Sequence, residues 1–401
     1  MVRVELGGKP IIDIDTVPGD SGRLKEHVRR RIRGGGSRAV HLSWNTTVPR
    51  IVLTSDTDDF DPTVISHFQQ EGFQLSYLAY DGNKANYTAA LQHLQDPLEL
   101  GEKYAIVAYG DAAAHVLEAC MKPMPKLVAV VAYYPPYMPR STTNFPPTLG
   151  VLVHLAGSQK FGTRHPSYRY PNTRPGFAEH DLDEFDRVAA SLSWTRTLGL
   201  LREAFDMGGP DLEALWDHHT RLEFADRDTD KTVATMVAQP QRPHVNHVPT
   251  MTGGVGHEEL HRFYEEFFMD NNPPDLSMRL LSRTVGVDRV VDEMFVRFTH
   301  TTEIPWILPG VPPTEKKVEV VLVSVVCMRG GKLVHEHVHW DQASVLVQVG
   351  LIDPKLIPDT FKTAEKGREQ EVERLPVCGR EAARKVLNED SSKSNQLIPD
   401  W

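Results

Sequence analysis

The sequence predicts two domains of different fold class, an α/β domain with a parallel sheet followed by an α+β domain with an antiparallel sheet. A chain of 401 residues is too long for one ordinary core, and two domains of about 150–200 residues are expected. Short apolar runs alternate with helical segments up to the breaker Met207–Pro210, after which helices come first and strands follow. We place the boundaries at 1–48 (irregular lead-in), 49–207 (first domain), 208–353 (second domain) and 354–401 (polar C-terminal tail).

Five short apolar runs predict the strands of the first domain: Arg50–Ser55, Phe73–Tyr80, Lys103–Tyr109, Lys126–Tyr134 and Thr148–Ala156. Helical patterns separate or follow them at Pro62–Glu71, Asn86–Gln95, Ala112–Met121 and Asp181–Phe205. Continuous apolar strands of this kind are typical of a parallel sheet that is covered on both faces.

The second domain begins with three predicted helices, at Asp211–Asp226, Thr229–Val237 and His257–Phe268. Four predicted strands follow, at Met278–Val285, Arg289–Thr301, Lys316–Met328 and Lys332–Asp341. Their connections are short, as at Gly330-Gly331, so we expect an antiparallel meander. In the tail only Arg380–Leu387 is expected to be helical.

Composition narrows the class of protein. A formal net charge of −10 argues against a nucleic-acid or anionic-membrane partner, because both favour basic surfaces. Three cysteines fit a reducing compartment without structural disulfides. Neither a signal-peptide pattern nor an apolar stretch of membrane-span length is present in the sequence, so we expect a cytoplasmic protein.

The turn Ala108–Ala112 follows a predicted strand and opens a helix, where an α/β-hydrolase carries its nucleophile; Gly110 fills that slot and offers no nucleophilic atom. Residues 45–205 resemble the dienelactone hydrolase family in this turn, in the run Tyr170–Ala178 and in the helix with Ser193–Thr197. In that family the catalytic His precedes a Gly-Phe pair, and Pro175 takes its place here. The resemblance implies an α/β hydrolase-like domain that is inactive and serves as a scaffold. In an alternative interpretation it has new chemistry through Asp111, His115 and His154.

The segment Lys332–Gly350 contains the most informative pattern of the chain. Side chains alternate along a strand, so one face carries His335, His337, His339 and Asp341, and the other carries Val334, Glu336, Val338 and Trp340. Imidazoles and a carboxylate on one face favour a polar pocket in which a carboxylate and a His act as acid and base. We expect the histidine face to line that pocket.

Residues 211–352 resemble the SnoaL-like polyketide cyclases, within the α+β cone fold that ketosteroid isomerases and nuclear transport factor share. The features are helices before a curved sheet, the strand Phe298–Thr301, the turn Pro309–Thr314 and a last strand that ends Trp340-Asp341-Gln342. The resemblance implies proton-transfer chemistry on carbonyl compounds (cyclisation, isomerisation or loss of water) with neither metal nor cofactor. It implies an acid/base carboxylate at Asp341.

The expected catalytic residues are therefore Asp341, His339, His337 and His247, and the expected substrate-binding residues are His300, Asp292, Trp306 and Tyr264. A metal bound by His335, His337 and His339, with His244 or His247, is the alternative. We do not favour it, because positions i and i+4 of a strand lie about 13 Å apart.

Three functions remain open at this point. The leading one is an acid/base enzyme that acts on a small carbonyl-bearing metabolite. A lactone or ester hydrolase is the second, suggested by the first domain and opposed by its missing triad. A non-catalytic protein that binds a small molecule, or dimerises, is the third. The expected partners are a small-molecule substrate and a second copy of the chain, bound through the sheet of the second domain.

Overall fold

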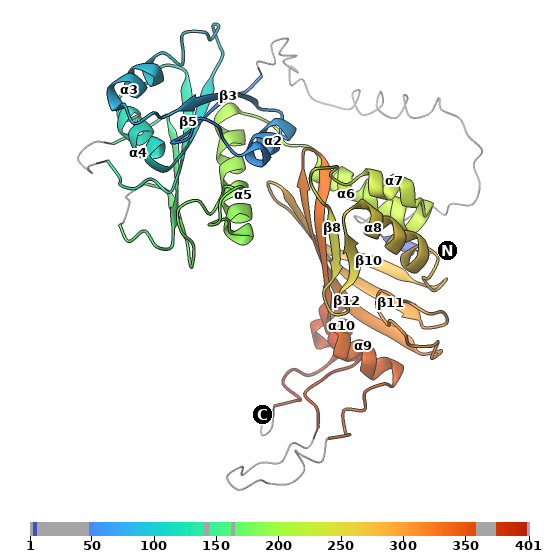
Figure 1. Cartoon of the computed structure of the whole chain (residues 1–401). Coiled ribbons are helices and arrows are strands. Elements are labelled where there is room, and N and C mark those ends of the chain that lie inside the picture. The colour runs from blue at the N-terminus through green and yellow to red at the C-terminus, as the bar shows by residue number, and fades with distance from the viewer. Residues whose placement is uncertain (1–2, 6–47, 140–143, 162–164, 358–373, 399–401) are drawn as a thin grey trace, which may run out of the picture.

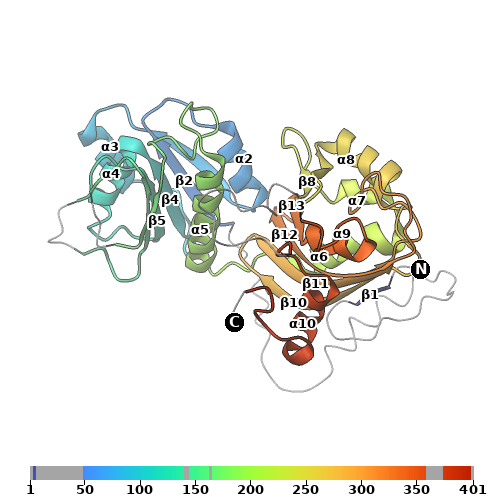
Figure 2. The same cartoon turned by 90° about the horizontal axis from the view of Figure 1, so that it is seen from below.

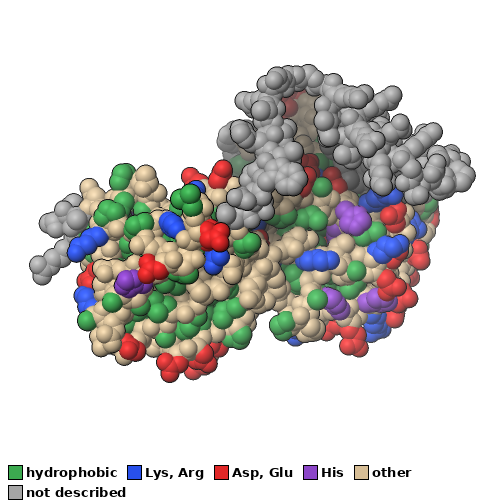
Figure 3. Space-filling view, turned by 90° about the horizontal axis from the view of Figure 1, so that it is seen from above, with side chains coloured by type: hydrophobic (Ala, Val, Ile, Leu, Met, Phe, Trp, Pro, Cys, Tyr) green, Lys and Arg blue, Asp and Glu red, His purple; other side chains and the backbone are tan. Residues whose placement is uncertain are grey.

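The computed structural model describes residues 3–5, 48–139, 144–161, 165–357 and 374–398, which form two lobes built on two separate sheets (Figure 1). Each sheet has its own buried hydrophobic clusters. Figure 3 shows the lobes from above, with acidic and basic side chains interspersed on that face.

The first sheet has six strands in the order β3-β2-β4-β5-β6-β7, all parallel. The strands are β2 (Arg50–Ser55), β3 (Gln74–Ala79), β4 (Tyr104–Tyr109), β5 (Leu127–Tyr133), β6 (Gly150–Ala156) and β7 (Ser167–Tyr170). The helices are α2 (Pro62–Gln70), α3 (Lys84–Gln92), α4 (Gly110–Ala119) and α5 (Arg187–Phe205). Every residue of β4 is buried, as expected for a strand covered on both faces. The predicted parallel sheet is confirmed, and the short edge strand β7 is an addition to it.

Local capping explains where the helices of this half begin. Asp61 accepts hydrogen bonds from the amides of Thr63 and Val64, and Pro62 occupies the first turn of α2, where a missing N–H costs nothing. Helix α5 begins at Arg187 rather than at the predicted Asp181, because Asp186 caps it.

The second sheet has seven strands in the order β1-β10-β11-β12-β13-β8-β9. Their bounds are β1 (Arg3–Glu5), β8 (His244–His247), β9 (Thr252–Val255), β10 (Ser277–Val285), β11 (Arg289–Thr299), β12 (Lys317–Arg329) and β13 (Lys332–Trp340). The predicted antiparallel meander is confirmed as β10 to β13. Buried and half-buried residues alternate along most of β12, so one face of the sheet packs into a core.

Helices cover the concave side of this sheet (Figure 2). They are α6 (Leu212–Arg221), which continues into the π-helical segment η1 (Leu222–Asp226), then α7 (Thr229–Ala234), and α8 (His257–Phe263), which continues into the π-helical segment η2 (Tyr264–Phe268). Two later helices, α9 (Gln342–Val349) and α10 (Arg380–Leu387), pack against β12. This arrangement encloses a cavity between the sheet and α6, η1 and η2.

The two ends of the chain differ from the sequence prediction in one respect. Residues Arg3–Glu5, predicted to belong to an irregular lead-in, pair in parallel with β10. Residues 6–47 of that predicted lead-in, and 358–373 and 399–401 of the predicted tail, lie outside the described residues. The predicted short helix in the tail is confirmed as α10. Within the described residues, no helix has the length and apolar character to cross a membrane.

The hairpin between β12 and β13 docks against the first half of the chain. Arg329 lies 2.7 Å from the imidazole of His67, and the amide of Gly330 donates to Glu71 at 2.9 Å. Gly330 has a φ of +54°, and a Cβ there would come within 2.8 Å of the carbonyl oxygen of Gln70. Only glycine allows this close approach. The strand β13, which carries the most informative segment of the sequence, is therefore anchored at its start.

Candidate functional site

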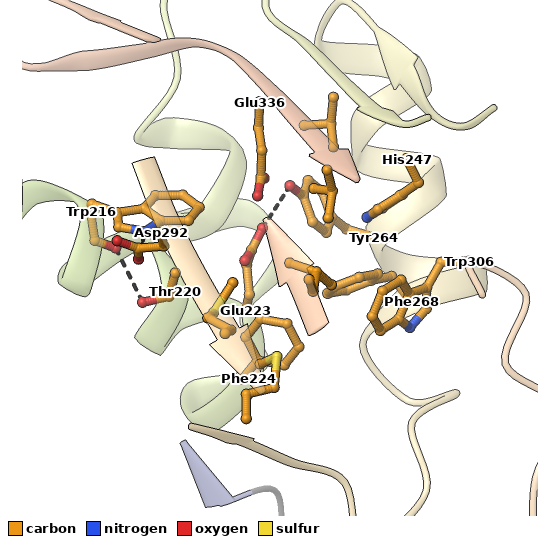
Figure 4. Close-up of a pocket in the computed structure, with 15 residues that line it drawn as sticks. Trp216, Thr220, Glu223, Phe224, His247, Tyr264, Phe268, Asp292, Trp306 and Glu336 are labelled. Carbon is orange, nitrogen blue, oxygen red and sulfur yellow. Dashed lines mark hydrogen bonds between the residues drawn. The ribbon is translucent and has the colours of Figure 1, made fainter. Parts of the chain in front are cut away.

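The cavity of the second half has a volume of about 40 Å³, enough for a few water molecules. Its walls are mainly aromatic and apolar, with a few polar side chains (Figure 4). The lining residues are Trp216, Thr220, Glu223, Phe224, Val245, His247, Tyr264, Phe268, Met278, Asp292, Met294, Trp306, Leu322, Glu336 and Val338. An apolar pocket with a few convergent polar groups is the usual form of a small-molecule site.

Two glutamates dominate the polar part of the cavity. Glu223 comes from η1 and Glu336 from β13, and their side chains are only 4% and 7% exposed. Figure 4 shows the two carboxyl groups directed toward one another, with the hydroxyl of Tyr264 beside them. A glutamate side chain is almost never buried to this extent unless it is paired with another group or has a functional role.

Hydrogen bonds hold Glu223 in place from two sides. The hydroxyl of Tyr264 donates to Oε1 at 2.7 Å, and Nε2 of His219 lies 3.0 Å from the same oxygen. Both Glu223 and Tyr264 stand in π-helical segments that extend regular helices, a distortion that is frequent at functional sites. The distortion therefore coincides with the two residues that are hydrogen-bonded to each other at the cavity wall.

Glu336 has a different environment. Its Oε1 accepts a hydrogen bond from the buried hydroxyl of Ser324 at 2.8 Å. Burial and, to a smaller extent, the nearby Glu223 raise the pKa of Glu336 to about 8, although His219 and the hydrogen bond from Ser324 oppose the shift. Glu336 consequently keeps its proton at neutral pH.

His219 completes the cluster. It is 1% exposed, and its ring stacks on Trp216. Burial lowers its pKa, but the adjacent carboxylate of Glu223 outweighs this effect, and the pKa of His219 is raised above its ordinary value.

The same three residues form a group that could hold a metal ion: donor atoms of His219, Glu223 and Glu336 lie within 4.8 Å of one another. Each of the three residues also has a hydrogen-bond partner outside the group. Nδ1 of His219 contacts Thr235, Oε1 of Glu223 contacts Tyr264, and Oε1 of Glu336 contacts Ser324. These hydrogen bonds hold the three side chains in place around the cavity.

Asp292 lines the cavity as the sequence suggested, and its carboxylate is fully engaged there. Trp216 donates to one of its oxygens at 2.8 Å, and Arg283 binds both oxygens at 2.7 and 2.8 Å. A bidentate pair of this kind is strong and geometrically fixed. Asp292 thus supports the wall that carries Trp216.

Three further residues that were expected at the site do line the cavity: His247, Trp306 and Tyr264. Burial lowers the pKa of His247 to about 4, so its imidazole is neutral. Its Nδ1 lies 3.2 Å from the hydroxyl of Thr252, and the ring points toward the cavity. Trp306 donates to Asn272 at 2.9 Å and forms part of the aromatic wall.

The expectation that the histidine face of β13 lines the pocket is corrected by the structure. The alternation is as predicted, but Glu336, Val338 and Trp340 point inward, while His335, His337 and His339 point outward. The inward face is mostly apolar, and burying it together with one carboxyl group costs less than burying three imidazoles.

The outward residues have other contacts. His337 lies 2.9 Å from the imidazole of His244, and His335 stacks on His244. His339 and Asp341 are exposed. Asp341 caps helix α9 by accepting a hydrogen bond from the amide of Ser344 at 3.1 Å. The proposed catalytic pair Asp341–His339 therefore lies outside the cavity.

His300 is also displaced from its expected place. It follows the end of β11 and is buried, but it does not border the cavity, and its Nδ1 lies 3.0 Å from the hydroxyl of Thr314. His300 and Asp292 lie an even number of positions apart, so a continuous strand would place them on the same face. The strand β11 ends at Thr299, however, so His300 is not part of this alternation.

In the first half, Gly110 stands at the junction of β4 and α4 with a φ of +60°. A Cβ at this position would lie 2.3 Å from Oδ2 of Asp56. The carboxylate of Asp56 accepts hydrogen bonds from the amides of Asp111 and Ala112 at 2.9 and 2.7 Å, and so fills the space beside the turn. Pro175 is exposed in a turn.

The two histidines of the alternative set in the first half have different partners. His115 contacts the hydroxyl of Tyr80, whereas the buried His154 bonds to Tyr170 and Thr197. The two histidines therefore have no hydrogen-bond partner in common.

Sequence reasoning missed Glu223 and His219, and placed Glu336 on the wrong side. A usable signal existed for the first two, because Leu212, Trp216, His219 and Glu223 follow the helical spacing of a core-facing stripe. For Glu336 the signal was a single carboxyl group between apolar neighbours at alternate positions of a strand.

Comparison with known families finds the SnoaL-like domain over residues 212–336. Comparison with curated proteins gives no match. Among solved structures, a putative SnoaL-like polyketide cyclase from Jannaschia sp. CCS1 shares 16% identity over 35% of this chain and 94% of its own, with a TM-score of 0.27. AclR, a putative hydroxylase from Streptomyces galilaeus, shares 20% identity over 37% and 85%, with a TM-score of 0.28. A putative polyketide cyclase from Acidithiobacillus ferrooxidans shares 18% over 34% and 92%, with a TM-score of 0.26.

The family match is confined to residues 212–336, so the resemblance of residues 45–205 to dienelactone hydrolases stays a prediction. The matched residues include every residue that lines the cavity except Val338. The part of this chain that surrounds the buried glutamates is thus the part that matches the SnoaL-like domain.

Proposed function

We propose that the second half is an acid/base enzyme that moves a proton within a small carbonyl-bearing molecule. The observation that carries the proposal is the pair Glu223 and Glu336, two buried carboxyl groups at one cavity. Their environments differ, because burial raises the pKa of Glu336 to about 8, whereas one oxygen of Glu223 is bonded to both Tyr264 and His219. Titratable groups whose environments separate their protonation states are the usual acid and base of one site.

Glu223 is the base and Glu336 the acid in this proposal. The carboxylate of Glu223 removes a proton from the carbon beside the substrate carbonyl, and Glu336 transfers its proton to the carbonyl oxygen, which gives an enol. Return of the proton from Glu223 to another carbon of the same molecule, with return of the hydroxyl proton to Glu336, gives an isomer. Both hydrogen bonds to Glu223 use Oε1, so Oε2 is left for the substrate.

The walls of the cavity indicate a flat, apolar substrate. Phe268, Trp306 and Trp216 present aromatic faces, and ring stacking favours a planar partner. The present volume of about 40 Å³ is smaller than an organic ring requires, so binding displaces side chains. Phe224 and Met294 are partly buried at the border of the core, and methionine adapts readily to a new neighbour.

The two other functions have less support. A binding protein has no need for a buried carboxyl pair, which is costly unless it is used. A hydrolase needs a nucleophile at position 110, where Asp56 already fills the space beside the glycine.

The test is the conversion of a β,γ-unsaturated cyclohexenone to its conjugated isomer, followed by absorbance, together with a panel of other cyclic ketones. We expect Glu223→Gln to lower turnover about 100-fold or more, the usual effect of removing a general base. Glu293→Gln is the matched control, because Glu293 stands on β11 next to Asp292 with its side chain bonded to Ser282 outside the cavity. Turnover of folded Glu223→Gln close to that of the control, or no conversion of any ketone by the unmodified chain, would contradict the proposal.

A further inference from the structure

A second, larger pocket lies on the other side of His219. It has a volume of about 310 Å³ and opens to the surface of the second half. Its lining includes His219 and Thr235, whereas Glu223 and Glu336 line the first cavity. His219 thus stands between a closed acid/base cavity and a pocket that admits water.

Hydrogen-bond directions around His219 fix the places of its protons. The hydroxyl of Thr235 donates to the carbonyl oxygen of Thr232 at 2.6 Å, so its oxygen accepts from Nδ1 of His219, 2.5 Å away. On the opposite side, Oε1 of Glu223 already accepts from Tyr264, and Nε2 of His219 approaches it at 3.0 Å. A carboxylate oxygen is an acceptor only, so Nε2 carries a proton as well.

We propose that His219 is a buried imidazolium that serves both glutamates as their shared counter-ion and exchanges its proton, through Thr235, with water in the second pocket. The inference rests on the proposed function and adds to it a residue that positions charge without touching the substrate.

The charge balance of the reaction gives this ion its role. Before the proton moves, Glu223 is negative, Glu336 is neutral and His219 is positive. After Glu223 has taken the proton of the substrate and Glu336 has given its own to the carbonyl oxygen, the negative charge lies on Glu336. The donor atoms of all three residues lie within 4.8 Å of one another, so the same cation compensates either carboxylate. The cluster remains neutral throughout, and a buried uncompensated charge is avoided.

The groups that face His219 are known on both sides. On the cavity side they are Glu223 from η1, Glu336 from β13 and Tyr264 from η2; on the pocket side they are His218 from α6, Lys231 from α7 and Lys332 from β13. Lys231 pairs with Asp228, and Lys332 donates to the carbonyl oxygen of Ala234, so both lysines are engaged elsewhere. The carboxyl groups are the nearer partners and favour the imidazolium.

The decisive measurement is the protonation of His219 in the full chain, read from the nitrogen chemical shifts of labelled imidazoles as pH is varied. The signal is assigned by its loss in His219→Gln. We expect an imidazolium at neutral pH in the unmodified chain and a lower titration midpoint in Glu223→Gln, which removes the negative partner. Thr235→Val keeps the imidazole and removes its acceptor, and should also lower the midpoint. His218→Gln changes an exposed neighbour on the same helix and should leave it unchanged.

Turnover provides the second readout. His219→Gln should lower kcat about 100-fold with little change in KM, because the ion acts on the transfer step. In the unmodified chain kcat should decline at high pH, and in Thr235→Val this decline should begin at a lower pH than in the unmodified chain. A neutral His219 at neutral pH in the unmodified chain overturns the inference, even if Glu223→Gln abolishes turnover. An imidazolium in a chain that isomerises no ketone supports the ion pair and contradicts the proposed function alone.

Discussion

Both halves of the chain hold carboxyl groups in place with hydrogen bonds, but the settings of these groups differ. In the first half Asp56 lies against Gly110, and its two oxygens accept hydrogen bonds from the amides of Asp111 and Ala112 at the start of α4. In the second half Glu223 and Glu336 border a cavity. Hydrogen bonding of a carboxylate is therefore by itself a poor sign of function. A carboxylate that is saturated by backbone amides is structural, whereas one that keeps an oxygen at an open space is available to a ligand.

The largest effect that would sharpen this comparison is expected from Glu336→Gln. Glutamine keeps the shape and can donate a hydrogen bond to a carbonyl oxygen, but it cannot transfer a proton. We expect turnover of the ketone probe to fall by about 100- to 10,000-fold. The pH profile provides a second check. Because the pKa of Glu336 is raised to about 8, activity of the unmodified chain should fall as pH rises through that value. A variant with unchanged kcat would exclude Glu336 as the acid.

The protonated Glu336 also predicts how stability depends on pH. In the unfolded chain this carboxyl group loses its proton near its ordinary value of 4.5, whereas in the folded chain it keeps the proton up to about 8. Between these values the folded state binds more protons, so the free energy of unfolding decreases as pH rises. Melting temperatures measured from about pH 5 to about pH 9 should show this decline, and Glu336→Gln should weaken it. Equal slopes in both proteins would show that Glu336 is ionised when buried.

The contrasting prediction concerns the first half. Gly110→Ala places a Cβ 2.3 Å from Asp56 in a backbone conformation with a φ of +60°, so Asp56 must move and lose its amide contacts. The free energy of unfolding should fall by about 1–3 kcal/mol, while turnover per folded molecule is unchanged.

Gly72→Ala is the control for this change. Gly72 has a similar φ of +87° with open space around it, so it bears the backbone strain without the collision. The difference between the free energies of unfolding of the two variants, measured with denaturant, gives the contribution of the Asp56 contacts. Equal losses of stability would mean that Asp56 contributes nothing at this turn.

Much of this fold was predictable from the sequence, because its cause is local. Apolar runs between helices predicted the parallel sheet, and alternation with short connections predicted the meander from β10 to β13. The short strands β1, β7 and β9 were missed, since strands of three or four residues carry little periodicity.

The site was harder to predict because it depends on which face of a strand turns inward. Periodicity divides β13 correctly into two faces, but it does not decide between them. The decision comes from the partners of the strand: Val338 and Trp340 pack into the core, and Glu336 is carried inward with them. The partners of Glu336 come from η1 and α6, far away in the sequence, so their meeting with β13 is a property of the tertiary structure.

The smallest effect separates the two faces of β13 directly. Asp341 was the expected base, and the structure makes it the cap of α9, where it accepts from the amide of Ser344. Asparagine caps a helix about as well as aspartate, so Asp341→Asn should change neither turnover nor melting temperature appreciably. Asp341→Ala removes the cap and should lower the free energy of unfolding by about 0.5–2 kcal/mol, again with normal turnover per folded molecule.

Glu223→Gln should behave in the opposite way, with lost turnover and little loss of stability. Turnover and melting temperature measured on the same preparations distinguish a capping residue from a catalytic one. A loss of turnover in Asp341→Asn at an unchanged melting temperature would show that the catalytic residues lie on the outer face of β13. Loss of a helix cap lowers stability and does not by itself lower the turnover of the folded protein.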